Sequence, residues 1–332
     1  MVTIKDIAEQ AGVSFSTVSK ALRDSPLVKP GTKAHILAIA KAMGYQPNLA
    51  ARSLVSKRSG AIGIVWPSIE RAALSSLITK LSKELELQQY VTLLSISNIR
   101  SAIETFRRYQ LDAILIFGDQ NLTSEDFEMN SLHIPILTYG AAGYSPHSAV
   151  DVNRGQAIRL AVRHLTELGH RDIAYVGIPH SLDPLQAVKA EAFREELLAL
   201  GLPFRDSSIL RMEGLDFHDG YTAARTMLEG NDGTQRPTAI ISGGIDLTRG
   251  ILRAAGEQGL QVPRDLSIVS YDNLPQMESL EVPVTAVGVA ISSIADIITA
   301  TLLELIDCPD EVKTVYLEPE LIVRASTARP IA

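Results

Sequence analysis

Apolar positions in the larger part of this 332-residue chain follow two alternating patterns. From residue 61, short apolar runs alternate with amphipathic stretches that have helical spacing, which predicts parallel strands joined by helices. The predicted strands are Ala61–Trp66, Val91–Ile96, Ala113–Phe117, Ile134–Thr138, Asp172–Gly177, Ser208–Met212, Thr238–Ser242, Ser267–Tyr271, Thr285–Val289, Lys313–Leu317 and Leu321–Ala325. The series predicts an α/β body of two similar lobes, each a parallel sheet with helices on both faces.

The order of these runs predicts that the chain returns to its first lobe after building the second. We expect lobe 1 to comprise about residues 60–158 and 290–317, and lobe 2 about 159–289 and 318–332. Facing strand ends would then form one ligand cleft that can close as a hinge. The most apolar stretch, Val282 to Ile306, contains Asp296 and Glu304, so we interpret it as a buried strand and helix, not a membrane span.

The first 46 residues have a purely helical pattern. Thr3 and Asp6 have the spacing of a capping box at a helix start. Gly12 suits a left-handed helix end, and Ser14 can cap a second helix. Pro30 can begin a third. The residues predict three short helices.

The first two of these helices have helix-turn-helix spacing. Ala8 is a small residue where helices touch, Gly12 lies in the turn, and Val18 anchors the second helix. The start of the second helix should enter the major groove of DNA, and the alternative is a helical hairpin used only for packing. The predicted DNA-contacting residues of this segment are Thr3, Ser14, Phe15, Ser16, Thr17, Ser19 and Lys20.

Charge distribution supports a DNA partner for this segment alone. The chain has a formal net charge of −7, but residues 1–60 hold nine basic and three acidic residues. A basic segment on an acidic body predicts a polyanionic partner, although a solvated basic face would have the same composition. The single cysteine, Cys308, excludes an intrachain disulfide, and the N-terminus lacks a signal-peptide pattern. We therefore expect a cytoplasmic protein.

Two sequence runs carry a resemblance to a known family. The run T-I-K-D-I-A-E-Q-A-G-V-S-F-S-T-V-S-K-A-L and the run G-Y-Q-P-N-L-A-A-R-S-L, residues 44–54, resemble the head and hinge of the lactose-repressor/purine-repressor (LacI/GalR) family. The body resembles that family and periplasmic sugar-binding proteins. The resemblance implies a helix-turn-helix head over residues 1–46, a hinge over 47–59, and an effector-binding and dimerisation body over 60–332.

The resemblance also implies what the protein does. It implies a transcriptional regulator, most often a repressor, whose operator affinity is controlled by a small molecule, a sugar or sugar derivative, in the interlobe cleft. A homodimer would bind a near-palindromic double-stranded operator. We expect no coiled-coil tetramerisation segment and no membrane partner. The sequence leaves open the effector, the operator and whether the effector releases or promotes DNA binding.

The hinge is the second predicted DNA contact. Pro47 ends the third helix, and Asn48 can cap a helix too short to be stable alone. The resemblance implies that two such helices pair in the minor groove, where Leu54 pries apart a base step and Arg52 lies near phosphates. The alternative is a plain linker in which Leu54 packs on the body.

Five cleft residues are implied by the resemblance. Asp272 matches an aspartate that binds polar groups of the ligand, Phe217 matches a stacking aromatic, and Lys189 stands where the family usually has an arginine. Asp246 matches the aspartate of an A-N-D motif, and Trp66 ends the first strand and could cover the cleft. Three of them have a structural alternative: a turn cap for Asp272, a helix cap for Asp246 and core packing for Phe217.

Departures from the family pattern gather at these ligand positions. Ile245 replaces a contacting asparagine, Asn153 and Arg154 occupy a usual D-N pair, and Asp151 is a possible substitute in an uncertain register. Lysine cannot form the two-pronged contact of arginine, so Lys189 would suit a carboxylate or phosphate. We expect an effector that differs from the best-known family sugars.

Enzyme signatures are absent from the sequence. There is no G-x-x-x-x-G-K-S/T loop, H-E-x-x-H pair or G-x-S-x-G elbow, and His170 is interpreted as a structural turn histidine. We therefore expect no catalysis, metal or cofactor. A soluble sugar receptor, or an α/β enzyme with an appended DNA-binding head, are the competing functions.

Overall fold

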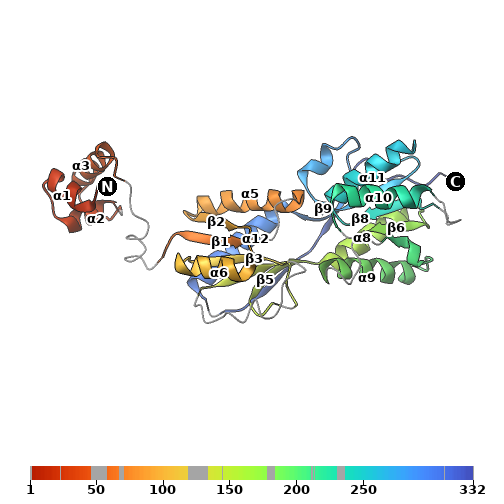
Figure 1. The fold of residues 1–332 in the computed structure, drawn as a ribbon, viewed down its shortest axis with the longest axis horizontal. Coiled ribbons are helices and arrows are strands. Elements are labelled where there is room, and N and C mark those ends of the chain that lie inside the picture. The colour runs from red at the N-terminus through yellow and green to blue at the C-terminus, as the bar shows by residue number, and fades with distance from the viewer. Residues whose placement is uncertain are drawn as a thin grey trace. The chain divides into compact units, whose positions relative to one another are not determined.

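The computed structural model divides the chain into two compact units, residues 1–59 and 60–332 (Figure 1). The residues it describes are 2–22, 24–45, 58–66, 71–118, 134–143, 145–177, 184–210, 212, 214–229, 236–309 and 311–331.

The first unit is a three-helix domain, as predicted. Its helices are α1 (Ile4–Ala11), α2 (Phe15–Leu22) and α3 (Pro30–Ala42). Thr3 and Asp6 form the predicted capping box, and Gly12 ends α1 at a left-handed φ of 65°. A small apolar core that includes the fully buried Val18 holds the three helices together.

Lobe 1 of the second unit is a parallel sheet in the order β11-β5-β4-β3-β1-β2. Its strands are β1 (Ala61–Val65), β2 (Val91–Ser95), β3 (Ala113–Phe117), β4 (Ile136–Tyr139), β5 (Ser148–Val152) and β11 (Thr314–Leu317). Helices α5 (Ala72–Leu87) and α12 (Ile291–Asp307) pack on one face. Helix α6 (Ile99–Arg108) packs on the other.

Lobe 2 repeats this plan in the order β12-β10-β9-β8-β6-β7. Its strands are β6 (Ile173–Val176), β7 (Ile209–Leu210), β8 (Ala239–Ser242), β9 (Ser267–Asn273), β10 (Thr285–Ala290) and β12 (Glu320–Ile322), and only β12 runs antiparallel to its neighbour. Helices α10 (Phe217–Glu229) and α11 (Ile245–Glu257) cover one face. Helices α8 (Arg154–Glu167) and α9 (Pro184–Ala199) cover the other, and the short 3-10 helices η1 (Asp206–Ser208) and η2 (Pro275–Glu278) lie in the connections.

Burial on both faces explains the continuous apolar runs. In β8, Ile240 packs toward α10 and α11, whereas Ala239 and Ile241 pack toward α8 and α9. Because alternate side chains of a strand point to opposite faces, a strand between two helical layers must be apolar throughout. The predicted fold class, a helical head and a two-lobed α/β body, is confirmed.

The chain passes between the lobes three times within the described residues: from β5 to α8, from β10 to α12, and from β11 to β12. Helix α8 packs on the second sheet from Arg154 onward, so the first passage comes about five residues before the predicted position near 158. Strand β5 was not predicted from the sequence, because Asp151 interrupts its short apolar run.

Two further structural predictions are confirmed. The apolar stretch from Val282 to Ile306 contains β10 and most of α12, and no helix among the described residues is long and apolar enough to cross a membrane. His170 is almost fully buried, with Nδ1 2.8 Å from Thr238 Oγ1 and Nε2 2.9 Å from the Ala328 carbonyl oxygen.

Candidate DNA interface and effector cleft

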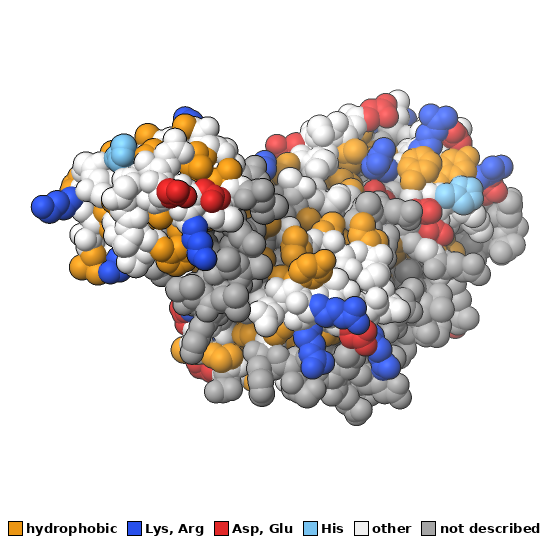
Figure 2. Space-filling model, turned by 60° about the vertical axis from the view of Figure 1, so that its left-hand side comes forward, with side chains coloured by type: hydrophobic (Ala, Val, Ile, Leu, Met, Phe, Trp, Pro, Cys, Tyr) orange, Lys and Arg blue, Asp and Glu red, His pale blue; other side chains and the backbone are white. Residues whose placement is uncertain are grey.

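The outer face of α2 is the candidate DNA-reading surface. Val18 and Ala21 bury the inner face, whereas Phe15, Ser16 and Lys20 are exposed, Phe15 to 52%. On the face that Figure 2 shows, basic side chains are spread over the head, and hydrophobic side chains reach the surface between them. This helix therefore combines a fixed backbone with an aromatic, a hydroxyl and a cation that face solvent.

The other predicted contact residues of the head also hold its helices. The Thr17 backbone N–H donates to Ser14 Oγ at 3.2 Å, which caps α2 as predicted, and the two hydroxyl oxygens lie 2.8 Å apart. Thr3 makes its hydrogen bonds with Asp6, and Ser19 is half-buried. Thr3, Ser14 and Thr17 thus have a structural role whether or not they also contact DNA.

The hinge residues predicted to contact DNA cannot be placed in the same way. Arg52 and Leu54 lie outside the described residues, as does the predicted short helix that contains them. Their roles stay predictions.

Asp272 lies at the carboxyl end of β9 in an unusual backbone conformation. Its φ is 81°, in the left-handed region that a residue other than glycine adopts rarely, and such residues concentrate at functional sites. Lys189, Arg71 and Arg154 lie within electrostatic reach of its carboxylate. Burial raises the pKa of Asp272, and the three cations oppose this shift. The strand end thus holds a carboxylate at a position that the fold constrains.

Lys189 is committed to contacts inside the protein. Its side chain is 2% exposed, Nζ donates to the Gly243 carbonyl oxygen at 3.1 Å, and Nζ lies 3.5 Å from the centre of the Tyr271 ring. A lysine held in this way supports Asp272 and the end of β8. The expected role of Lys189 in binding a carboxylate or phosphate stays a prediction, and it would require the ammonium group to leave these contacts.

An ion pair occupies the first passage between the lobes. Asp151 is buried and pairs with Arg154, and its Oδ2 also accepts the Ala142 N–H at 3.1 Å. Tyr139 from lobe 1 and Tyr271 from lobe 2 lie within electrostatic reach of this pair, and burial raises the pKa of both tyrosines.

Together these side chains form one group, which we call the interlobe cluster. Sequence reasoning named Asp151 and Arg154 without a firm role and missed both tyrosines, whose only signal is that they lie at or near the ends of strands. The members of the cluster are Arg71, Tyr139, Asp151, Arg154, Lys189, Asp246, Tyr271 and Asp272.

The remaining predicted effector residues have three different placements. Trp66 is fully buried in the lobe 1 core, with its ring centre 4.2 Å from that of Phe117. Phe217 is 42% exposed at the start of α10 and stacks on Tyr221, so core packing does not explain it. Asp246 does not cap its own helix, because its Oδ2 accepts the Ala72 N–H of α5 in the other lobe at 3.2 Å.

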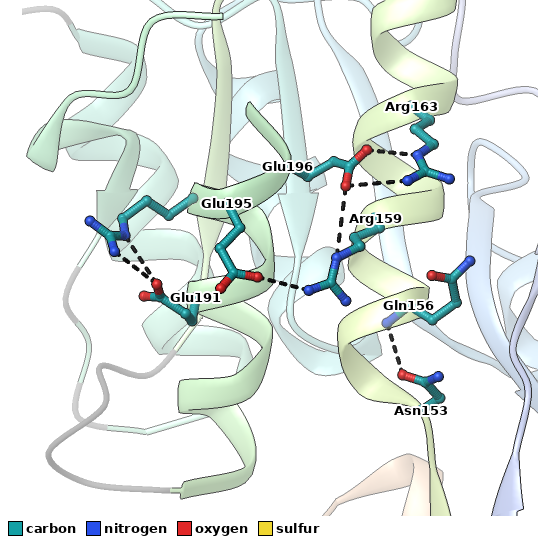
Figure 3. Close-up of polar contacts among 8 residues, drawn as sticks. Asn153, Gln156, Arg159, Arg163, Glu191, Glu195 and Glu196 are labelled. Atoms are coloured by element: carbon teal, nitrogen blue, oxygen red, sulfur yellow. Dashed lines mark hydrogen bonds and ion pairs between the residues drawn. The ribbon is translucent and has the colours of Figure 1, made fainter. Parts of the chain in front are cut away.

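A hollow of about 920 Å³ opens on the α8–α9 side of the Asp151–Arg154 pair. Its helical wall is held by ion pairs that Figure 3 shows: Arg159 bridges Glu195 and Glu196, and Arg163 pairs with Glu196 at 2.6 Å. None of the five predicted effector residues lines this hollow. The hollow and the interlobe cluster share only Asp151 and Arg154, and the effector role of Asp272 and Phe217 stays a prediction.

Within the described part of the chain, no group of three or more histidine, cysteine, aspartate or glutamate side chains could hold a metal ion.

Comparisons with known proteins agree with this architecture. Residues 3–48 match the family model of bacterial regulatory proteins of the lacI family, and residues 162–327 match a periplasmic binding protein-like domain. A structure of the lac repressor dimer bound to operator and the anti-inducer ONPF is similar over 98% of this chain and 99% of that one, with a TM-score of 0.86 and 24% identity.

Two curated relatives extend over most of the chain. The HTH-type transcriptional repressor PurR of Photorhabdus laumondii is 27% identical over 98% of this chain and 97% of its own. Catabolite control protein A of Priestia megaterium is 30% identical over 86% of this chain and 89% of its own. With its helix-turn-helix head and its two-lobed body, the chain belongs to the LacI family of DNA-binding transcriptional regulators, which are not enzymes.

Proposed function

We propose that this protein is a cytoplasmic repressor that binds a near-palindromic operator as a homodimer and changes its operator affinity when a sugar or sugar derivative binds between the lobes. The observation that carries the proposal is the exposed face of α2, where Phe15, Ser16 and Lys20 extend from a helix whose other side is buried. A helix that exposes such side chains at its start has the form of a major-groove reading helix.

In this proposal the DNA contacts divide into two kinds. Ser16 and Lys20 read base edges, and Phe15 makes an apolar contact. The hinge residues contribute the second kind, because Arg52 contacts phosphates and Leu54 enters the minor groove between base pairs. The head, hinge and body are residues 1–46, 47–59 and 60–332.

The effector in this proposal is a neutral, hydroxyl-rich molecule. Asp272 can accept hydrogen bonds from hydroxyl groups, and the half-exposed ring of Phe217 gives a flat surface for a sugar ring. Lys189 already donates to Gly243 and lies within electrostatic reach of Asp272, so its ammonium group is engaged within the protein, which favours a neutral ligand over one that needs this cation. Among structures of similar fold, CelR is in complex with cellobiose and a regulator from Enterococcus faecium holds ribose.

The dimer surface in this proposal is β2, one of the two outer strands of the lobe 1 sheet. Strand β2 pairs only with β1 among the described strands and exposes Val91 to 54%, Leu93 to 37% and Leu94 to 43%. Hydrophobic side chains also reach the surface of the body in Figure 2. An exposed apolar edge strand tends to pair with another chain, because its backbone N–H and C=O groups have no partner on that side. A second copy covers it here, which brings two heads to two half-sites. Sedimentation of a Leu93→Asp variant should show monomers, and unchanged dimers would refute this surface.

A gel-shift experiment tests the proposed function. The full chain should slow the migration of operator DNA in the gel, and a chain that begins at residue 60 should not. Both chains should bind the same ligand. Candidate ligands come from a thermal-shift screen of neutral sugars, sugar phosphates, sugar acids and purines. A ligand at 100 times its Kd should add about 2.7 kcal/mol of stability. Operator binding by the truncated chain, or a response to purines or charged sugars alone, would contradict the proposal.

A further inference from the structure

Helix α5 belongs to both lobes. Leu77, Leu81 and Leu85 pack into the core of lobe 1. Ala73, in the first turn, packs instead into the apolar cluster of lobe 2 that contains residues of α10 and α11. Figure 1 shows α5 lying lengthwise on lobe 1 and reaching the boundary between the lobes. Its amino end is therefore a point where the two lobes touch.

The amino end of α5 takes its cap from the other lobe. The first N–H groups of a helix have no partner within the helix and need an external acceptor. Arg71, at the N-cap position, makes no capping bond with its side chain. The Ala72 N–H donates instead to Asp246 Oδ2 at 3.2 Å, across 174 positions of sequence. A carboxylate at this position also interacts favourably with the helix dipole.

A second bond joins α5 to another segment of lobe 2, one helical turn later. Gln276 Nε2 donates to Ser76 Oγ at 3.2 Å, and Gln276 lies in η2, four residues after Asp272. Asp246 is also close to Asp272 in space. It is two residues after Gly244, where an added Cβ would lie 3.4 Å from Asp272 Oδ2. Both bonds to α5 thus come from segments that flank the proposed effector residue.

We propose that Asp246 is an interlobe clasp, a positioning residue that caps α5 when the lobes are in the arrangement described here and loses this bond when they separate. The inference rests on the proposed function in one respect, that the effector binds beside Asp272. An effector there lies next to the clasp, so its binding and the position of α5 become linked. The resemblance implies that the residue at this position contacts the ligand directly. The hydrogen bond instead joins the Asp246 carboxylate to helix α5 of lobe 1.

Loss of the Asp246 bond should change effector affinity in a direction set by which lobe arrangement the effector prefers. A ligand shifts an equilibrium between two lobe arrangements only through its different affinity for each. If the effector needs the arrangement with the clasp formed, loss of the clasp lowers the fraction of competent molecules and raises the apparent Kd by the same factor. Asp246 therefore affects effector affinity without touching the effector.

Amide hydrogen exchange in the ligand-free full chain tests the clasp. Asp246→Ala should speed exchange of the peptide that begins α5 about tenfold, the loss expected for one hydrogen bond of about 1.4 kcal/mol. Asp246→Asn keeps an acceptor oxygen and should stay close to the parent. Ser76→Ala removes the exposed second bond and should have a smaller effect than Asp246→Ala.

Two outcomes would overturn the clasp: unchanged exchange in Asp246→Ala, or equal opening in Asp246→Asn and Asp246→Ala. Because the measurement needs no ligand, it stands apart from the proposed function. A carbohydrate screen without a hit would contradict the proposed effector class and leave the exchange result intact.

Discussion

The DNA-reading face and the interlobe cluster are built in opposite ways. Phe15, Ser16 and Lys20 lie within one short helix, and its period alone puts them on one exposed face. Lys189 and Asp272 come from different elements, and the fold brings them together. Substitutions on α2 should therefore change binding without changing stability, whereas substitutions in the cluster should change both.

The largest expected effect is unfolding of the head by one substitution that leaves the body folded. Val18→Asp places a carboxylate at a fully buried position of a small core, which should cost about 3–5 kcal/mol and unfold the three-helix unit. Specific operator binding should disappear in a gel shift, while the thermal transition of the body stays. The matched control is Leu27→Asp, because Leu27 is 78% exposed in the same unit. Loss of the body transition in Val18→Asp would show that the two units do not fold independently.

Substitutions on the exposed face of α2 should change DNA binding and leave the stability of the head unchanged. Lys20→Ala and Ser16→Ala should each lose about 1–3 kcal/mol of discrimination between base pairs, if the contacts reach base edges. Lys41→Ala, an exposed lysine near the end of α3, is the control and should leave base preference unchanged. Binding to a set of operator variants measures both. A change of preference in Lys41→Ala alone would refute the assignment of α2 as the reading helix.

Asp272→Asn should separate stability from effector response. The amide is nearly isosteric, and asparagine tolerates the left-handed φ of 81°. Burial raises the pKa of Asp272, so the folded state disfavours its charge, and the neutral side chain should raise Tm by a few degrees. Effector affinity should fall about tenfold, because hydrogen bonds to a charged acceptor are roughly twice as strong as neutral ones.

The pH dependence of this gain has a definite sign. An acid whose folded pKa is raised loses folding stability as the pH rises from its unfolded pKa through its folded pKa. The parent should therefore be least stable relative to Asp272→Asn at neutral pH, and the difference should shrink as the pH falls through the raised pKa toward 3.8. Thermal unfolding at several pH values measures this. A difference that grows on acidification would contradict the assigned cause.

The same contrast explains what the sequence could predict. Thr3, Gly12 and Ser14 act through neighbours three or four positions away, so their caps could be predicted from spacing. The place of Asp272 at the end of β9 could be predicted from the apolar run that precedes it, whereas its effector role stays a prediction. The bond from Ala72 to Asp246 could not be predicted, because the two residues are far apart in the sequence and only the passages between the lobes bring them together.

Strand β5 and the two tyrosines of the interlobe cluster were missed for the same reason. Strand β5 contains the buried Asp151, whose charge is balanced by Arg154. Tyr139 and Tyr271 resemble core aromatics because their rings continue the apolar runs of their strands. A local pattern cannot show that a polar group inside a strand has a partner from elsewhere.

Removing one ion pair from the body and one from the head should give the smallest changes in stability. In the body, Glu196 is almost buried between Arg159 and Arg163, so Glu196→Gln should cost about 1–2 kcal/mol in thermal unfolding. In the head, Asp24 pairs with Lys33 at 2.5 Å but its side chain is 90% exposed, so Asp24→Asn should change stability by less than about 0.5 kcal/mol.

Glu195→Gln is the control within the body. Glu195 pairs with the same Arg159, but its side chain is 53% exposed, so the expected cost is again below about 0.5 kcal/mol. Salt separates the cases further, because exposed pairs are screened and buried ones are screened much less. Added salt should therefore leave most of the Glu196→Gln effect in place. If the three variants had equal effects, or if salt removed that of Glu196→Gln, the α8–α9 wall would be held by ordinary surface electrostatics, and burial would not distinguish the body from the head.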